Sequence, residues 1–97
     1  MHPADINAAL RKAGSSQARV ARSLAADGLP VTHSAVHMVV SGRGASARIA
    51  RRISEITGLP VARLWPGRYA PLESEQAAAR AARAAARKAR QASKEPQ

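Results

Sequence analysis

The chain has 97 residues, of which 16 are lysine or arginine and 6 are aspartate or glutamate, giving a formal net charge of +10. A basic excess this large predicts a polyanionic partner, most simply nucleic acid. The absence of cysteine excludes disulfides, thiolate metal sites and thiol nucleophiles, and no apolar run approaches the ~20 residues of a membrane span.

Two helices are predicted in the first part of the chain, over residues 3–13 and from residue 15 or 16 to residue 26. Pro3 suits a first helical turn, and Gly14 suits a helix end. Either Ser15 or Ser16 can cap the second helix, which Asp27-Gly28 terminates. Apolar residues recur in both at helical spacing: Ile6, Ala9, Leu10 and Ala13, then Ala18, Ala21, Leu24 and Ala25.

A third helix is predicted between Thr32, a good N-cap, and Gly42, a good stop. Its inner face carries Ala35, Val36 and Val39. The opposite face has hydrogen-bond donors and acceptors and a methyl-bearing side chain but no full charge, which suits the base edges of a DNA major groove. That face consists of His33, Ser34, His37, Met38 and Ser41. We therefore expect the third helix to be the recognition helix of a helix-turn-helix.

Two more helices complete the predicted domain, one capped by Ser46 and ended by Gly58, the other over Val61 to Leu64. The first has an apolar stripe of Ile49, Ile53 and Ile56, and Glu55 is expected to pair with Arg51 or Arg52. Since the chain has no Phe, its core should consist of Leu, Ile and Val around Trp65. Trp65 and Tyr69 could stack on single-stranded nucleic acid, but a core role is the stronger interpretation.

The composition changes at about residue 70, which predicts a helix-turn-helix domain over residues 1–70 and a basic tail, helical or disordered, over residues 71–97. No large apolar residue follows Leu72, so the tail cannot bury a core of its own. Between residues 77 and 94 it has six cations and no acid: Arg80, Arg83, Arg87, Lys88, Arg90 and Lys94. We expect an arm that binds DNA non-specifically, with a merely solvated charged face as the alternative.

The predicted fold class is all-α, and its five short helices, with the break between the second and third, resemble the lambda-repressor-like DNA-binding fold. Motifs at both ends are similar to those of the Ner-like (Nlp) family of phage-type transcriptional regulators. These motifs are His2-Pro3-Ala4-Asp5-Ile6, Ala9-Leu10-Arg11-Lys12 and Leu64-Trp65-Pro66-Gly67-Arg68-Tyr69. Two features depart from the family pattern: the link over residues 26–31 is about three residues longer than the usual turn, and residues 43–58 match less well than the ends.

In a helix-turn-helix, the first residues of the second helix reach base edges while the preceding helix crosses the phosphates. This geometry predicts base contacts by His33, Ser34, His37 and Met38, with Met38 able to pack on a thymine methyl group. The predicted phosphate contacts, which fix the register, are Gln17, Arg19, Thr32 and Arg43. Arg68 is a further candidate. The alternative is that His33 and His37 are simply exposed helical residues.

Metal binding and catalysis are not expected. The i, i+4 spacing of His33 and His37 could ligate a metal, but His2 is the only other imidazole in the chain. Asp5 and Asp27 are expected at helix ends, and no set of nucleophile, base and orienting residue is visible. The sequence therefore predicts no enzyme and no cofactor.

Together these features predict a sequence-specific, DNA-binding transcriptional regulator, most simply a repressor of phage or phage-derived origin. We expect a soluble cytoplasmic protein associated with the nucleoid, since no apolar signal segment follows Met1. It should be a monomer in solution that could pair on DNA, because no additional helix with large apolar residues is present. One alternative is an architectural, nucleoid-associated protein, and another is an antitoxin-like protein-interaction module.

Overall fold

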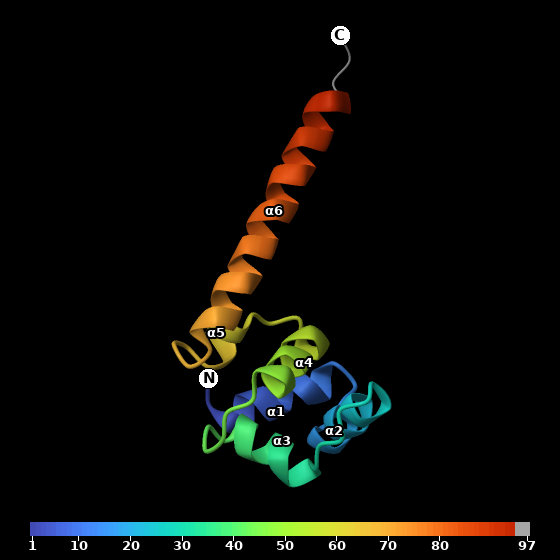
Figure 1. Ribbon diagram of the computed structural model, residues 1–97, viewed down its shortest axis with the longest axis vertical. Coiled ribbons are helices and arrows are strands. Elements are labelled where there is room, and N and C mark those ends of the chain that lie inside the picture. The colour runs from blue at the N-terminus through green and yellow to red at the C-terminus, as the bar shows by residue number, and fades with distance from the viewer. Residues whose placement is uncertain (95–97) are drawn as a thin grey trace.

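The computed structural model describes residues 1–94, and side chains through residue 90; residues 95–97 of the tail and the Lys94 side chain lie outside the described part. The predicted all-α fold is confirmed, with six helices in the described range and no strand. Five of them form a rounded body from which the sixth projects, giving extents of 58 × 27 × 25 Å (Figure 1). The helices are α1 (Pro3–Lys12), α2 (Gln17–Ala26), α3 (His33–Val40), α4 (Ala47–Thr57), α5 (Val61–Leu64) and α6 (Ala70–Lys94).

The predicted helix starts rest on side-chain caps. The hydroxyls of Ser16, Thr32 and Ser46 accept hydrogen bonds from backbone N–H groups in the first turns of α2, α3 and α4, at 3.2, 3.0 and 3.3 Å. Each cap satisfies a donor that has no partner within its helix. The cap of α1 was not anticipated: His2 Nδ1 accepts from the backbone N–H of Ala4 at 3.0 Å.

The end of α3 is closed by a glycine, as predicted. Gly42 has a φ of +79°, a conformation that side chains with a Cβ rarely adopt. It turns the chain back so that the backbone N–H groups of Arg43 and Gly44 both donate to the carbonyl of Met38 at 3.0 Å. This pattern fixes the length of α3 and holds the loop that follows against its last turn.

The core consists of aliphatic residues around Trp65, as predicted. Every one of the five helices of the body contributes to the eight largest fully buried side chains: Ile6, Leu10, Val20, Val36, Val40, Ile53, Val61 and Leu64. Ile56 lies only at the rim of this core, whereas Ser54 is buried in it. Among residues 1–94, no helix is both long and apolar enough to cross a membrane.

The first turns of α6 pack into the same core, although the composition predicts a boundary at residue 70. Leu72 is only 4 % exposed. Gln76 donates to Ser54 Oγ at 3.1 Å and accepts from the backbone N–H of Val61 at 2.9 Å, so it joins α6 to α4 and α5. The root of α6 is therefore a fixed part of the domain rather than a loose attachment.

The ion pair predicted between Glu55 and Arg51 or Arg52 is present with Arg52, and two further pairs join α4 to α2 and α6. Glu55 does lie near Arg52, at 3.9 Å, but Arg52 also binds Asp27 at the end of α2. The pKa of the Arg52 guanidinium is raised above its ordinary value, mainly by the hydrogen bond to Asp27. Desolvation opposes this shift, and the negative charges of Asp27 and Glu55 add to it. Arg51 pairs instead with Glu75 of α6, at 2.7 Å. This pair is exposed and contributes at most about 1 kcal/mol, but it adds a contact at the root of α6.

Trp65 and Tyr69 are core residues, which confirms the interpretation favoured from the sequence over a stacking role. Both are 6 % exposed, and their rings meet edge to face with centroids 5.6 Å apart. The Tyr69 hydroxyl accepts a hydrogen bond from the backbone N–H of Ser46 at 3.3 Å. Because their ring faces are covered, they cannot serve as stacking platforms, and Tyr69 instead connects the root of α6 to the start of α4.

Replacing Tyr69 by Phe tests this connection. The substitution keeps the ring and removes the acceptor of the Ser46 N–H, so we expect the free energy of unfolding to fall by about 1 kcal/mol. Amide exchange at the start of α4 should become faster. Urea unfolding and hydrogen exchange measure the two effects, and an unchanged urea midpoint with unchanged exchange would contradict the role assigned to the hydroxyl.

Candidate nucleic-acid interface

Helix α3 lies at the end of the molecule farthest from the free end of α6 (Figure 1). Val36, Val39 and Val40 anchor it in the core, where it packs mainly against α2. All four residues predicted to contact bases are exposed on its other side: His33, Ser34, His37 and Met38. The structure thus brings these four together on one outward surface, called the α3 face below.

Met38 is a noteworthy member of the α3 face, since its side chain is 41 % exposed. Among the large hydrophobic residues that the structure describes, only Met1 is exposed to a similar degree. Leaving an unbranched apolar side chain in water gains nothing for folding. Contact with an apolar group on a partner, such as a thymine methyl, would bury it.

The start of α3 is held by a polar network from α1 and α2. Gln17 donates to Asn7 Oδ1 at 2.9 Å, and its amide oxygen lies 3.2 Å from Nε2 of His33. In this pairing His33 Nε2 carries the proton, so Nδ1 is the acceptor that a neutral ring offers to a ligand. Gln17, predicted as a phosphate contact, therefore also orients His33. Asn7 has no counterpart in the sequence prediction, because nothing in the pattern of α1 distinguishes it from an ordinary exposed residue.

A shallow polar groove runs along this network, between α1 and the first turns of α2 and α3. It brings Arg11, Gln17, His33 and His37 together with the capping serine of α2. Arg19 lies nearby but is turned back, donating to the carbonyl of Gly14 at 3.0 Å. The groove combines a cation, side-chain amides and the positive end of α2, which is an arrangement that suits a backbone phosphate.

The other end of the α3 face is fixed by the loop after α3. A Cβ on Gly44 would lie 3.1 Å from Cβ of Met38, so the loop backbone packs directly against the Met38 side chain. Arg68 donates to the Gly44 carbonyl at 3.3 Å and holds the loop from the other side. Arg43, a predicted phosphate contact, is exposed in this loop. Cations thus flank both ends of a face that itself has no full charge.

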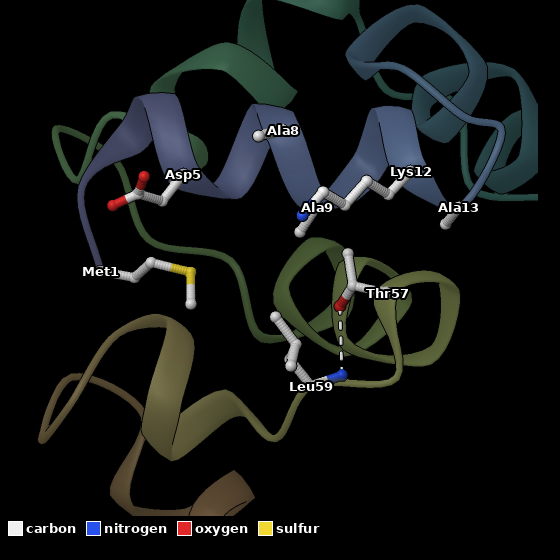
Figure 2. Close-up of a pocket in the computed structure, with 8 residues that line it drawn as sticks. All are labelled: Met1, Asp5, Ala8, Ala9, Lys12, Ala13, Thr57 and Leu59. Atoms are coloured by element: carbon white, nitrogen blue, oxygen red, sulfur yellow. Dashed lines mark hydrogen bonds between the residues drawn. The ribbon is translucent and has the colours of Figure 1, made fainter.

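Other hollows lie elsewhere on the surface. One lies on the opposite side of α1, between that helix and Thr57–Leu59, where the Thr57 hydroxyl accepts from the Leu59 N–H at 3.3 Å (Figure 2). Its lining is largely methyl groups, with Asp5 and Lys12 as the ionisable side chains, which do not make a set of nucleophile, base and orienting residue. Within residues 1–94 no three His, Asp or Glu residues gather where they could hold a metal ion.

Removing the cap of α3 tests how far the α3 face depends on it. Thr32→Ala deletes the acceptor of the Ala35 N–H, and we expect the free energy of unfolding to fall by about 1 kcal/mol. DNA affinity should fall as well, because the first turn presents His33 and Ser34. Urea unfolding and fluorescence anisotropy measure the two effects. Thr32→Ser keeps the acceptor and is the matched control, so equal stability of the two variants would contradict the prediction.

A comparison with protein families matches residues 1–82 to the family described as winged helix-turn-helix DNA-binding. The matched region covers α1 to α5 and the root of α6. No β-strand occurs in the described residues, so residues 1–94 contain no β-structure that could form a wing. Comparisons with curated proteins and with solved structures find no match.

Proposed function

This chain belongs to the winged helix-turn-helix DNA-binding family, and from that premise we propose that it is a sequence-specific regulator of transcription that places α3 in the DNA major groove. The observation that carries the proposal is the α3 face: four exposed residues, three with hydrogen-bonding side chains and one apolar, flanked by cations. Base edges present donors, acceptors and methyl groups, and phosphates lie on either side of them. The α3 face has the complementary arrangement.

Individual roles follow from position. Ser34 and His37 would hydrogen-bond base edges, His33 would accept through Nδ1 from an exocyclic amine, and Met38 would contact a thymine methyl. Phosphate contacts would come from Gln17, Arg19, Thr32 and Arg43, with Arg11 added by the groove in which it lies. In the part of the chain that the structure describes, no ion pair engages Arg11, Arg19 or Arg43. Arg19 would have to release the Gly14 carbonyl to reach a phosphate.

We also propose that the regulator is a repressor of the Ner-like, phage-derived type. The motifs at the two ends support this, and their residues have specific tasks: His2 caps α1, Tyr69 binds the Ser46 N–H, and Arg68 holds the Gly44 carbonyl. Occupation of an operator is the regulatory action that a DNA-binding domain can perform by itself. Since Met1 and Met38 are the exposed large apolar residues of the described part, we propose a monomer in solution that pairs on DNA.

Selection of bound duplexes from a random pool, using the full-length protein, tests the function. We expect a shared motif and an affinity for it about 10³-fold or more above that for random duplex. A ratio below about 10 would contradict sequence-specific regulation and would favour an architectural DNA-binding protein, which the basic helix α6 could serve.

A further inference from the structure

The arginines of α6 lie along one face of the helix. Arg80, Arg83 and Arg87 follow each other at intervals of three and four residues, which places them on the same side. Arg83, Arg87 and Arg90 together line one shallow depression, and Arg80 and Arg83 line a groove between α6 and the loop after α4. We call the surface formed by Arg80, Arg83 and Arg87 the arginine face.

The arginine face destabilises the isolated helix. Like charges at these intervals repel one another, whereas alternating signs would stabilise the helix. No acid lies between residues 76 and 94 of α6 itself to compensate. Glu55 of α4 lines the groove that contains Arg80 and Arg83, but no ion pair holds Arg80, Arg83 or Arg87 within the described residues. The arrangement is therefore unfavourable until an anionic partner lies against it.

The direction of α6 separates this surface from the α3 face. Helix α6 is 25 residues long, about 38 Å, and runs along the long axis of the molecule away from α3 (Figure 1). Its root is held by Leu72, by the Gln76 hydrogen bonds and by the Arg51–Glu75 pair. Electrostatic interactions are screened over about 8 Å at physiological ionic strength, and α6 carries its arginines away from the end of the molecule where a duplex on α3 would lie (Figure 1).

We propose that the arginine face binds a second DNA duplex, so that one protein molecule bridges two DNA segments. This deepens the proposed function and rests on it, since the first duplex is the one on α3. Guanidinium groups bind phosphate oxygens in bidentate fashion, and a duplex offers them at close intervals. A protein partner fits less well, because protein interfaces depend on large anchoring side chains and alanine is the only apolar residue after Leu72.

The test is capture of a second duplex by protein held on a first. The selected duplex is fixed to beads, full-length protein is added, excess protein is removed, and a labelled duplex of unrelated sequence is then offered. The wild-type protein should retain the labelled duplex, whereas R80Q/R83Q/R87Q should retain at least about tenfold less. The log–log salt slope of capture should fall in magnitude by about 2.7 for three lost phosphate contacts. The charge-conserving variant R80K/R83K/R87K should retain most of the capture.

Two further measurements decide the geometry. The triple glutamine variant should keep its affinity for the selected duplex within about twofold. On a first duplex shortened to a single half-site, which takes one protein even if the protein pairs on the full site, the sedimenting complex should contain one protein and two duplexes. Loss of affinity for the selected duplex would place the arginine face on the same DNA and overturn the proposal. The proposal would also be overturned if the wild-type protein captured no second duplex, or if the complex contained two proteins. Absence of capture would favour an acidic protein as the partner of the arginine face. Sequence preference in the selection tests α3 alone, so either claim can fail without the other.

Discussion

Ser34→Asp should reduce the affinity for the selected duplex by at least about 100-fold while leaving the domain folded. Ser34 is exposed in the first turn of α3, two residues after the Thr32 cap. In the complex, a carboxylate at this position would face base edges and phosphates, and like charges placed together at an interface cost several kcal/mol. Each 1.4 kcal/mol corresponds to a factor of ten in affinity, so about 3 kcal/mol suffices for the expected loss.

The same substitution should not lower the stability of the fold, so a loss of DNA affinity can be separated from unfolding. A negative charge near the N-terminus of a helix interacts favourably with the helix dipole, by about 0.3 to 1 kcal/mol. Thermal unfolding followed by circular dichroism should therefore show an unchanged or slightly higher midpoint. Fluorescence anisotropy with a single short duplex at fixed salt measures the affinity.

The matched control is Ser74→Asp, which changes the net charge equally on an exposed residue near the start of α6. We expect it to alter affinity by no more than about twofold, because Ser74 is outside the α3 face and α6 projects away from α3 (Figure 1). If Ser34→Asp lowered affinity no more than Ser74→Asp, α3 would not be the reading element and the proposed function would lose its basis.

Leu72→Ala should lower the free energy of unfolding by about 2 to 5 kcal/mol, the cost of removing a buried leucine side chain and leaving a cavity. A domain of this size is stable by only about 4 to 12 kcal/mol, so the variant should lose a large part of its stability. The expected fall in melting temperature is about 4 to 8 °C for each kcal/mol. Leu72 is 4 % exposed and lies in α6 just after the proposed boundary at residue 70.

Urea unfolding followed by the fluorescence of Trp65, the single tryptophan, measures the loss in the core itself. Ala82→Gly on the exposed part of α6 is the control, with an expected effect on the core transition of less than about 1 kcal/mol. Should Leu72→Ala behave like this control, the root of α6 would be separable from the domain. The fixed direction of the arginine face would then lose its structural support.

The sequence by itself determined the limits of the first five helices to within a few residues and the largely aliphatic character of the core, because both depend on local signals. Ser16, Thr32 and Ser46 cap their helices through hydroxyls only a few residues from the donors they satisfy, and Gly42 and Gly58 end helices through their own backbone conformation. The short helix at Val61–Leu64 followed from another local signal, the proline before it, and the exposed α3 face followed from periodicity along one element. The proposed base contacts required that periodicity together with the docking geometry of a helix-turn-helix.

Only the tertiary structure decided how distant parts of the chain meet. The burial of Ser54 is tolerated because its hydroxyl donates to the Leu59 carbonyl and accepts from Gln76, and Arg51 pairs with Glu75 because the start of α6 lies against α4. The network from Asn7 through Gln17 to His33 crosses three helices. The direction of α6 depends on the same kind of contact. Such pairings join residues far apart in sequence, and no pattern within a single helix specifies them.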